Sequence, residues 1–215
     1  MDYDRDALDE TSVAHDPFAQ FSRWLEEALA TEGLIEPYAM TVATVDAEAK
    51  PDARVVLLRG FDQRGFTFFT NYASRKGTEL AAHPFAALLF FWAPLQRQIR
   101  IEGRVTKLDA GESDAYFARR PRGHRLSAWA SPQSAPVDGR ATLEKAMAEA
   151  EERFAGVEVP RPEHWGGYRV AGDRFEFWQG RRNRVHDRLA YVKVPSVPAA
   201  DPGMQDQWRI LRLAP

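Results

Sequence analysis

Cysteine is absent from this chain of 215 residues. Its absence excludes disulfide bonds, thiolate metal ligands and a cysteine nucleophile, and it fits a reducing compartment. No apolar run approaches the roughly 20 residues that a membrane span requires. The first residues are acidic and polar, unlike a secretory signal. We therefore expect a cytoplasmic protein with no membrane partner.

An excess of charge of either sign is also lacking, since the formal net charge is −2. Without a strongly positive field, the chain is not expected to bind nucleic acid. Its five histidines have no second ligand at a useful spacing, so no metal site is expected. Glycine-rich phosphate loops and nucleophile elbows are missing from the sequence as well. Any anion site must therefore come from local clusters of basic residues.

Hydrophobic periodicity predicts one helix followed by many strands. Asp16 and Pro17 form a helix start, apolar residues then recur at helical spacing, and Gly33 supplies a stop signal. Strands are expected in 39–62 (two), 65–71, 85–93, 97–108, 173–179, 188–194 and 207–213, and helices in 109–121 and 137–154. Residues 156–167 are interpreted as a connector without a strand, in which Trp165–Gly167 form a turn.

This pattern of many short strands with a few helices predicts an α+β domain built on a closed or partly closed β-barrel. Residues 16–215 are expected to form this single domain. Residues 1–15 are expected to form a flexible or lid-like segment before it.

A first candidate anion site is the stretch "TNYASRKGTEL", in which Ser74 is placed to cap a helix. Arg75 and Lys76 fall in the first turn of that helix, at the positive end of its dipole, which is unfavourable unless an anion joins them. Free backbone N–H groups, a hydroxyl and two cations together suit a phosphate. A solvated helix start is the alternative.

Two further basic clusters are candidates for anion binding, although each is also compatible with a solvated surface. In "RVVLLRG", Arg54 and Arg59 lie five residues apart and are predicted to point to opposite faces of a regular strand. In the stretch "YFARRPRGHR", several basic side chains crowd one turn beside a tyrosine: Tyr116, Arg119, Arg120, Arg122, His124 and Arg125.

The fourth cluster is "EFWQGRRNRVHDR", residues 176–188, which follows a predicted strand. Alternation in an extended segment places Arg184, His186 and Arg188 on one face beside Trp178. A one-sided array of this kind indicates a pocket wall, and Arg181 and Arg182 are interpreted as solvent-exposed turn residues. Taken together, the clusters predict two anion sites beside aromatic rings, which suits a phosphorylated flat cofactor and a phosphorylated small substrate.

The same segments, in the same order, resemble the pyridoxine/pyridoxamine 5′-phosphate oxidase family. The strings that carry the resemblance are "RVVLLRGFD", "FFTNYASRKG", "RQIRIEG", "YFARRPR", "AWASPQS", "VPRPEHWGGYRV", "EFWQGRRNRVHDR" and the terminal "RLAP". The resemblance implies a homodimeric split β-barrel that holds FMN at the subunit interface. It also implies oxidation of pyridoxamine or pyridoxine 5′-phosphate to pyridoxal 5′-phosphate by O₂, with release of hydrogen peroxide and, from the amine, ammonia.

Residue roles follow from the resemblance position by position. The FMN phosphate is implied to meet Arg54, Arg75 and Lys76 beside Ser74. The remaining implied flavin contacts are Phe69, Thr70, Gln98, Gln133, Ser134, Trp178 and Arg188. The substrate phosphate is implied to meet Tyr116, Arg120 and His124, while Arg59 contacts both cofactor and substrate. Arg184 and His186 are implied to be the catalytic pair that embraces the pyridine ring.

Several positions depart from the family pattern. Arg59 stands where lysine is usual, His124 where serine is frequent, and Val185 where leucine is usual. An N-terminal lid motif is nearly absent, although Tyr3 lies at the matching distance as a substrate contact. Two alternatives stay open: another split-barrel flavin oxidase or reductase with a phenazine-type substrate, and a non-enzymatic protein that binds flavin or pyridoxal phosphate.

Overall fold

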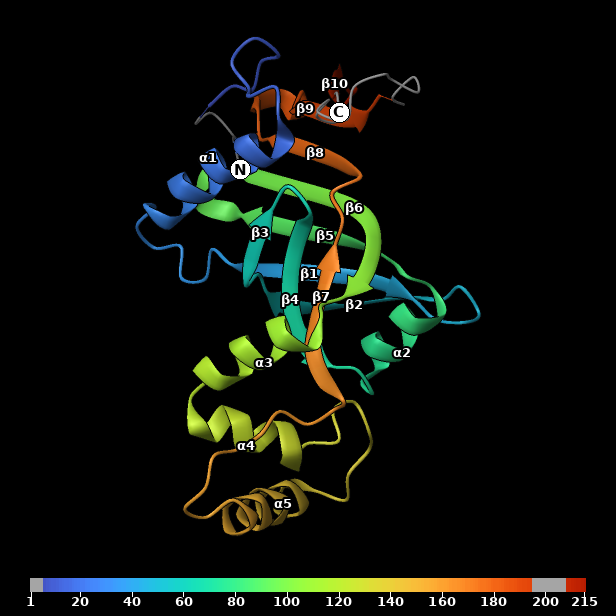
Figure 1. The fold of residues 1–215 in the computed structure, drawn as a ribbon. Coiled ribbons are helices and arrows are strands. Elements are labelled where there is room, and N and C mark those ends of the chain that lie inside the picture. Colours follow the sequence, from blue (N-terminus) through green and yellow to red (C-terminus); the bar gives the residue numbers. More distant parts are fainter. Residues whose placement is uncertain (1–5, 195–207) are drawn as a thin grey trace.

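The computed structural model describes residues 6–194 and 208–215 (Figure 1). Its helices are α1 Pro17–Leu29, α2 Arg75–Ala82, α3 Ala110–Arg119, α4 Arg122–Ala130 and α5 Arg140–Arg153, with short 3₁₀ turns η1 Ala93–Leu95 and η2 Arg182–Arg184. Its strands are β1 Ala39–Val45, β2 Pro51–Leu57, β3 Gly60–Asp62, β4 Gly65–Asn71, β5 Phe85–Trp92, β6 Arg97–Lys107, β7 Trp165–Val170, β8 Arg174–Gln179, β9 Asp187–Lys193 and β10 Trp208–Arg212. Tyr3 lies outside the described residues.

The described strands form one antiparallel sheet that divides at β6. Seven strands follow the order β10-β9-β8-β6-β5-β1-β2, while β7 pairs with the end of β6 and continues the sheet to β4 and β3. The first part of β6 pairs with β8 and its last residues pair with β7. Gly103 lies at this division, where a Cβ atom would be 1.7 Å from the carbonyl oxygen of Ala171. The predicted α+β split barrel is confirmed.

Aromatic side chains fill the barrel, and α1 covers it with its apolar face. Asp16 caps α1 by accepting hydrogen bonds from Phe18 and Ala19, as its sequence predicts. The ring of Phe21 then packs edge-on against Phe66 and Phe90, at 4.9 and 5.2 Å between centroids. Burial of these large rings supplies most of the local packing energy.

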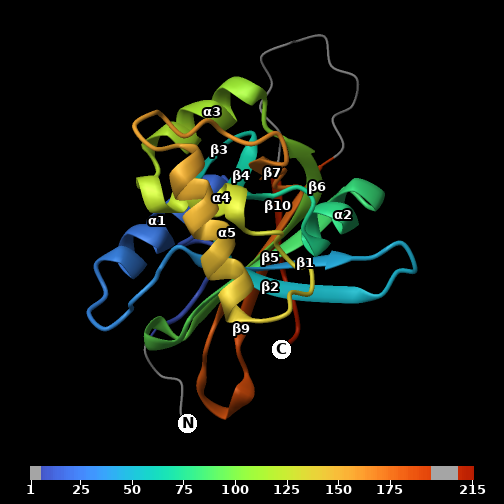
Figure 2. The ribbon, with the colours of Figure 1, turned by 90° about the horizontal axis from the view of Figure 1, so that it is seen from below.

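A second, smaller core lies outside the barrel and joins α3, α4 and α5 to the start of β7. Its buried side chains include Phe117, Leu126, Phe154 and Trp165. Figure 2 shows α5 beside α4, on the outer side of this layer. The helix α4 was missed from the sequence, which indicated only a basic turn there; the break at Pro121 instead separates two helices.

The prediction that Trp165–Gly167 form a turn is wrong, because they begin strand β7 and pair with β4. Two glycines in a row suggest a turn, but here the missing side chain makes room for a neighbour. A Cβ atom on Gly166 would lie 2.2 Å from the hydroxyl oxygen of Tyr72, which donates a hydrogen bond to the carbonyl of Gly167 at 3.0 Å. Because the Tyr72 hydroxyl lies so close to the Gly166 backbone, a larger residue at position 166 would force Tyr72 to move.

Replacement of this glycine is therefore expected to destabilise the fold. Gly166→Ala should lower the free energy of unfolding by about 1–3 kcal/mol, the usual cost of overpacking. In Gly123→Ala the added methyl meets no atom within 4 Å, so stability should hold or rise by up to about 1 kcal/mol. Thermal and urea unfolding of both variants test this; equal stabilities would contradict the close approach.

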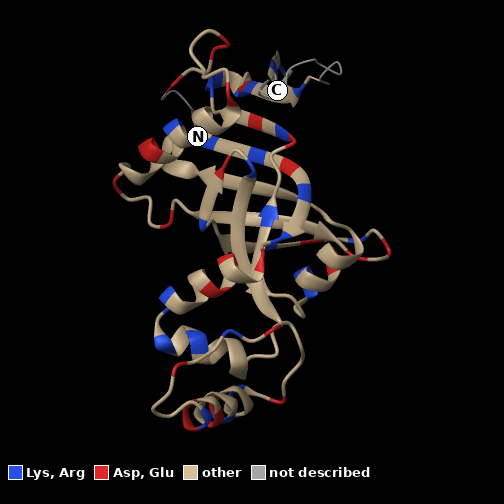
Figure 3. Cartoon of the chain, viewed as in Figure 1, with Lys and Arg blue, Asp and Glu red and all other residues tan. Residues whose placement is uncertain are grey.

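Charge is mixed over the surface. In Figure 3, Lys and Arg alternate with Asp and Glu along the upper strands and along the outer helices. Within the described ranges, no helix is long and apolar enough to cross a membrane.

Candidate functional site

A pocket of about 550 Å³ opens between β2, β4, the start of α2 and the α3–α4 turn. Its lining residues are Arg54, Val55, Val56, Leu57, Arg59, Phe69, Thr70, Lys76, Tyr116, Arg119, Arg120, Pro121, His124, Gln133 and Trp165. Among these described residues five are Lys or Arg and none is Asp or Glu. A pocket with such a lining favours an anionic ligand.

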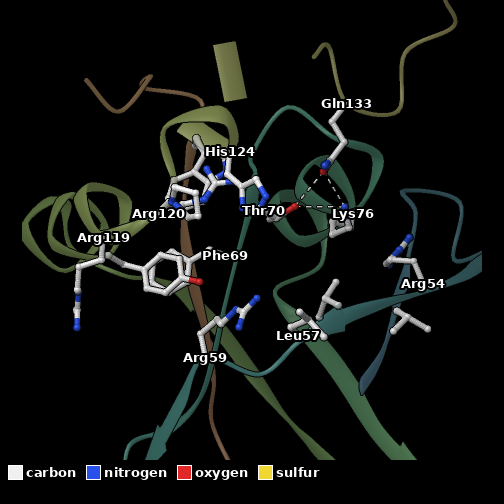
Figure 4. A pocket seen from close by; sticks show the side chains of 15 residues that line it. Arg54, Leu57, Arg59, Phe69, Thr70, Lys76, Arg119, Arg120, His124 and Gln133 are labelled. Atoms are coloured by element: carbon white, nitrogen blue, oxygen red, sulfur yellow. Dashed lines mark hydrogen bonds between the residues drawn. The ribbon is translucent and has the colours of Figure 1, made fainter. Parts of the chain in front are cut away.

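One end of the pocket is built around Lys76, at the start of α2. Ser74 caps this helix by accepting a hydrogen bond from the Gly77 N–H, as predicted. The Lys76 ammonium lies 3.0 Å from the amide oxygen of Gln133 and 3.3 Å from the Thr70 hydroxyl (Figure 4). Burial, followed by the charge of Arg54, lowers the pKa of Lys76. A bound anion would act in the opposite direction and favour the charged ammonium.

Two carboxylates behind this end hold its arginines. The Arg54 guanidinium contacts Asp52 at 2.6 Å and Glu79 at 2.9 Å, and Arg75 also pairs with both. Burial alone would raise the pKa of Glu79, but hydrogen bonds from Thr44, Arg75 and Arg54 outweigh it and lower the pKa. Glu79 therefore stays ionised and fixes Arg54 in place.

Acid is expected to weaken this arrangement. A carboxylate whose pKa is lowered by folding stabilises the protein fully above its usual value of 4.5 and loses that contribution as pH falls through the lowered value. Glu79→Gln should cost about 1.5–3 kcal/mol at pH 7 and should flatten the fall in unfolding free energy below pH 4.5. Urea unfolding at a series of pH values measures both; parallel curves for variant and parent would contradict the role.

The other end of the pocket is built around Arg120, in the break between α3 and α4. Its guanidinium lies 4.5 Å from the ring of Trp165, and within the described chain its buried Nη1 has no hydrogen-bond partner. Burial lowers the pKa of Arg120, with Arg59 acting in the same direction. An unpartnered buried donor of this kind is a strong indication of a missing acceptor.

Stacked aromatic rings line the pocket beside Arg120 and Arg59. Tyr116 lies parallel to Phe69 at 3.8 Å between centroids, and the nearly parallel Trp165 ring lies 5.5 Å from Phe69 and 6.2 Å from Tyr116. Figure 4 shows Arg59 and Arg120 on one side of the pocket, Lys76 and Gln133 on the other, and Arg119 pointing away. The pocket therefore offers two cationic ends, with a flat aromatic wall beside the Arg120 end.

The structure brings nine of the predicted site residues together in this pocket. The predicted site residues that line it are Arg54, Arg59, Phe69, Thr70, Lys76, Tyr116, Arg120, His124 and Gln133. The expectation that Arg54 and Arg59 point to opposite faces applied to a single regular strand; β2 ends at Leu57, before Arg59, and both residues line the pocket. Ser74 lies buried behind the lining, and Arg75 lies exposed outside it.

The remaining predicted residues lie elsewhere. Of the described residues, Gln98, Ser134, Trp178, Arg184, His186 and Arg188 do not line this pocket. Gln98, Trp178 and Arg188 form a row across three strands, since Gln98 pairs with Trp178 and Trp178 with Arg188. The Arg188 side chain donates to Glu176 at 2.8 Å and to the carbonyl of Ala214.

The prediction that Arg184, His186 and Arg188 lie on one face of an extended segment is wrong. Residues Arg182–Arg184 form η2, and both Asn183 and Arg184 have left-handed backbone angles, with φ of 58° and 61°. Each such residue costs about 1–2 kcal/mol, so neighbouring contacts must hold the turn. His186 follows it and packs 4.7 Å from the Trp178 ring.

Arg181, interpreted from the sequence as a solvent-exposed turn residue, is only partly exposed and has partners. It donates to the carbonyl of Asp6 at 2.8 Å and lies 3.5 Å from the Asp187 carboxylate. Glu79 and Trp165 were not predicted as parts of the site either. The spacing of four between Arg75 and Glu79 on a helix was the available signal for the first, and nothing in the local pattern marks the second.

Fold and site together define a split-barrel protein whose pocket suits a phosphorylated ligand. Residues 25–154 match the family described as pyridoxamine 5′-phosphate oxidase, and residues 165–215 match the pyridoxine 5′-phosphate oxidase C-terminal dimerisation region. The chain belongs to the pyridoxamine 5′-phosphate oxidase family. It is 57% identical, over all of its length and 96% of the relative's, to a Burkholderia lata protein named pyridoxine/pyridoxamine 5′-phosphate oxidase.

Other relatives agree with this assignment. A Cupriavidus necator protein of the same name is 56% identical over 97% of this chain and 93% of its own. Among solved structures, Burkholderia lata PhzG in complex with tetrahydrophenazine-1-carboxylic acid superimposes with a TM-score of 0.86, at 30% identity over 98% of both chains. An FMN-binding protein from Nostoc punctiforme shares the fold, with a TM-score of 0.69 at 17% identity over 95% of this chain and 99% of its own.

Proposed function

We propose that the protein is an FMN-dependent oxidase that converts pyridoxamine and pyridoxine 5′-phosphates to pyridoxal 5′-phosphate in vitamin B6 metabolism. The single observation that carries the proposal is the pocket with two cationic ends, aromatic rings beside one of them and no acidic lining residue among those described. Two phosphorylated, planar molecules suit such a pocket. FMN, when bound, supplies a two-electron acceptor that O₂ reoxidises with formation of hydrogen peroxide.

The Lys76 end fits the FMN phosphate. Lys76 and Arg54 line it, Ser74 lies behind Lys76, and Arg75 would reach it only by leaving Asp52 and Glu79. Beside this end, Thr70, Gln133 and Phe69 are proposed flavin contacts, and Ser134 follows Gln133 in the same loop. These residues bind and orient the cofactor.

The Arg120 end fits the substrate phosphate. Arg120 and His124 would hold it together with the Tyr116 hydroxyl, and Arg59 lies on the same side of the pocket as Arg120. Charge-assisted hydrogen bonds from Arg120 would satisfy its unpartnered Nη1. The stacked rings beside them would exclude water from one side of the site.

A second copy of the chain is proposed to complete the site. Gln98, Trp178 and Arg188 form their row on the sheet away from the pocket, and Phe91, next to Gln98 across the β5–β6 pair, is 55% exposed. Exposed aromatic side chains such as Phe91 on a sheet face are typical of a subunit interface. A homodimer would bring this row, with Arg184 and His186, against the pocket of its partner. There Arg184 and His186 would orient the substrate ring.

A reduced phenazine carboxylic acid is the second candidate substrate. The observation in its favour is the likeness to PhzG, whose structure contains tetrahydrophenazine-1-carboxylic acid. That molecule carries a carboxylate but no phosphate, so it would bring less negative charge and fewer acceptor oxygens to the Arg120 end than a phosphate ester. The relatives at 57% identity carry the pyridoxine/pyridoxamine name, which supports the B6 substrates.

Turnover of the two substrate classes decides between them. The FMN-loaded protein is supplied under air with pyridoxamine 5′-phosphate, pyridoxine 5′-phosphate or the reduced phenazine carboxylic acid, and peroxide is measured. The proposal expects the highest kcat/KM for a B6 phosphate. Faster oxidation of the phenazine would favour the second candidate, and tight FMN binding with no turnover of any of the three would favour a carrier.

A further inference from the structure

The carboxylate of Asp187 joins three parts of the chain beside the proposed catalytic pair. Its Oδ2 accepts a hydrogen bond from the Leu8 N–H at 3.1 Å and lies 3.5 Å from the Arg181 Nε. Its Oδ1 accepts from Arg212 at 2.8 Å. Because successive strand residues point to opposite faces, Asp187 faces away from Arg188. Asp187 is therefore placed to hold neighbouring segments rather than a ligand.

The same partners are tied to one another. Arg212 also donates to the Leu8 carbonyl at 3.0 Å and pairs with Glu10 at 2.7 Å. Arg181 donates to the carbonyl of Asp6 at 2.8 Å. The segment from Asp6 to Glu10, strand β10 and the turn before β9 thus share one network, and Asp187 contacts all three.

The network is connected to His186 by a hydrogen bond from the backbone of Arg181. The Arg181 N–H donates a hydrogen bond to Nδ1 of His186 at 3.0 Å. An imidazole nitrogen accepts a hydrogen bond only when it carries no proton, so the neutral ring must carry its proton on Nε2. The turn between the two residues contains the left-handed Asn183 and Arg184, and a strained turn keeps its shape only where its ends are held.

We propose that Asp187 is a positioning residue that, by holding Arg181, fixes His186 as the Nε2–H tautomer. His186 then presents a hydrogen-bond donor, rather than a base, to an acceptor atom of the substrate. The identity of that substrate rests on the proposed function, whereas the tautomer does not.

The tautomer is measured directly by nitrogen NMR of the FMN-loaded protein labelled with ¹⁵N-histidine, at a pH where histidine is neutral. The His186 signals are identified by their loss in His186→Gln. We expect Nε2–H in the parent and in Glu10→Gln, which removes the other carboxylate on Arg212 but leaves Asp187 in place. Asp187→Asn should show a mixture of tautomers. Nδ1–H in the parent, or an unchanged Nε2–H signal in Asp187→Asn, would overturn the proposal.

A second variant covers the case in which Asp187→Asn does not fold. Arg181→Ala keeps the backbone N–H but removes the contacts with Asp187 and Asp6, so it should also release the tautomer; an unchanged signal there would contradict the proposal equally.

Turnover gives an independent measurement. Asp187→Asn should lower kcat/KM for pyridoxamine 5′-phosphate by about tenfold or more, a typical result of misplacing a site residue, with FMN affinity unchanged and Glu10→Gln close to the parent. Unchanged turnover in Asp187→Asn would count against the positioning role. Absence of turnover in the parent itself would defeat the proposed function and leave the NMR result to decide the tautomer.

Discussion

Lys76→Met is expected to bind FMN about 10- to 100-fold more weakly than the parent protein. The ammonium lines the pocket beside Thr70 and Gln133, and a charge-assisted hydrogen bond to a phosphate contributes about 1.5–3 kcal/mol. Stability of the FMN-free variant should be equal or higher, because burial already disfavours the charged lysine. Flavin fluorescence titration and thermal unfolding measure the two quantities.

Arg75→Met is the matched control, since it removes a cation from the neighbouring position of the same helix. Arg75 is 58% exposed and pairs with Glu79 and Asp52, so its loss should weaken FMN binding less than the loss of Lys76. Unchanged FMN affinity in Lys76→Met would remove the phosphate from this end of the pocket. A larger effect at Arg75 would mean that α2 rearranges when the cofactor binds.

Arg184→Ala is expected to lose substrate turnover but to keep its affinity for FMN, unlike Lys76→Met. FMN affinity should stay at the parent value, while kcat/KM for pyridoxamine 5′-phosphate should fall about 100-fold or more, because correct placement of the substrate ring over the cofactor is lost. The alanine keeps the backbone of the turn, so the unfolding temperature should change little. Steady-state peroxide assays and FMN titration on the same preparation measure both effects.

The control for this variant is Arg182→Ala, which removes the same charge from the same 3₁₀ turn. It is expected to keep kcat/KM close to that of the parent protein. Equal losses in the two variants would show that the turn acts only through its overall charge. Loss of FMN from Arg184→Ala would place that residue with the cofactor rather than with the substrate.

The barrel and the basic residues of the pocket could be predicted from the sequence for physical reasons, whereas Phe69, Thr70 and Gln133 followed only from the family resemblance. Continuous apolar runs and the alternation in 97–108 indicate strands, and the Asp16 and Ser74 caps mark helix starts. The sequence indicates Lys76 and Arg120 as anion-binding residues, because cations at a helix start or crowded beside an aromatic residue are favourable when an anion joins them. The structure places both in one pocket.

Other features depend on contacts between distant segments, which no local pattern contains. Gly166 lies in a strand that pairs with β4, and the Tyr72 hydroxyl, from the turn after β4, occupies the space beside it. The left-handed Asn183 and Arg184 break an alternation that otherwise predicts an extended segment. Arg181 gains one partner, Asp6, from the distant N-terminal segment and another, Asp187, from the strand that follows it.

The spectrum of the flavin during reaction tests the central claim most directly. The protein is loaded with FMN, mixed with pyridoxamine 5′-phosphate without oxygen, and then exposed to air. We expect the visible flavin absorption to disappear on mixing and to return with air, with one pyridoxal 5′-phosphate and one hydrogen peroxide formed for each cycle. A flavin-saturated protein whose spectrum is unchanged by either B6 phosphate would contradict the account.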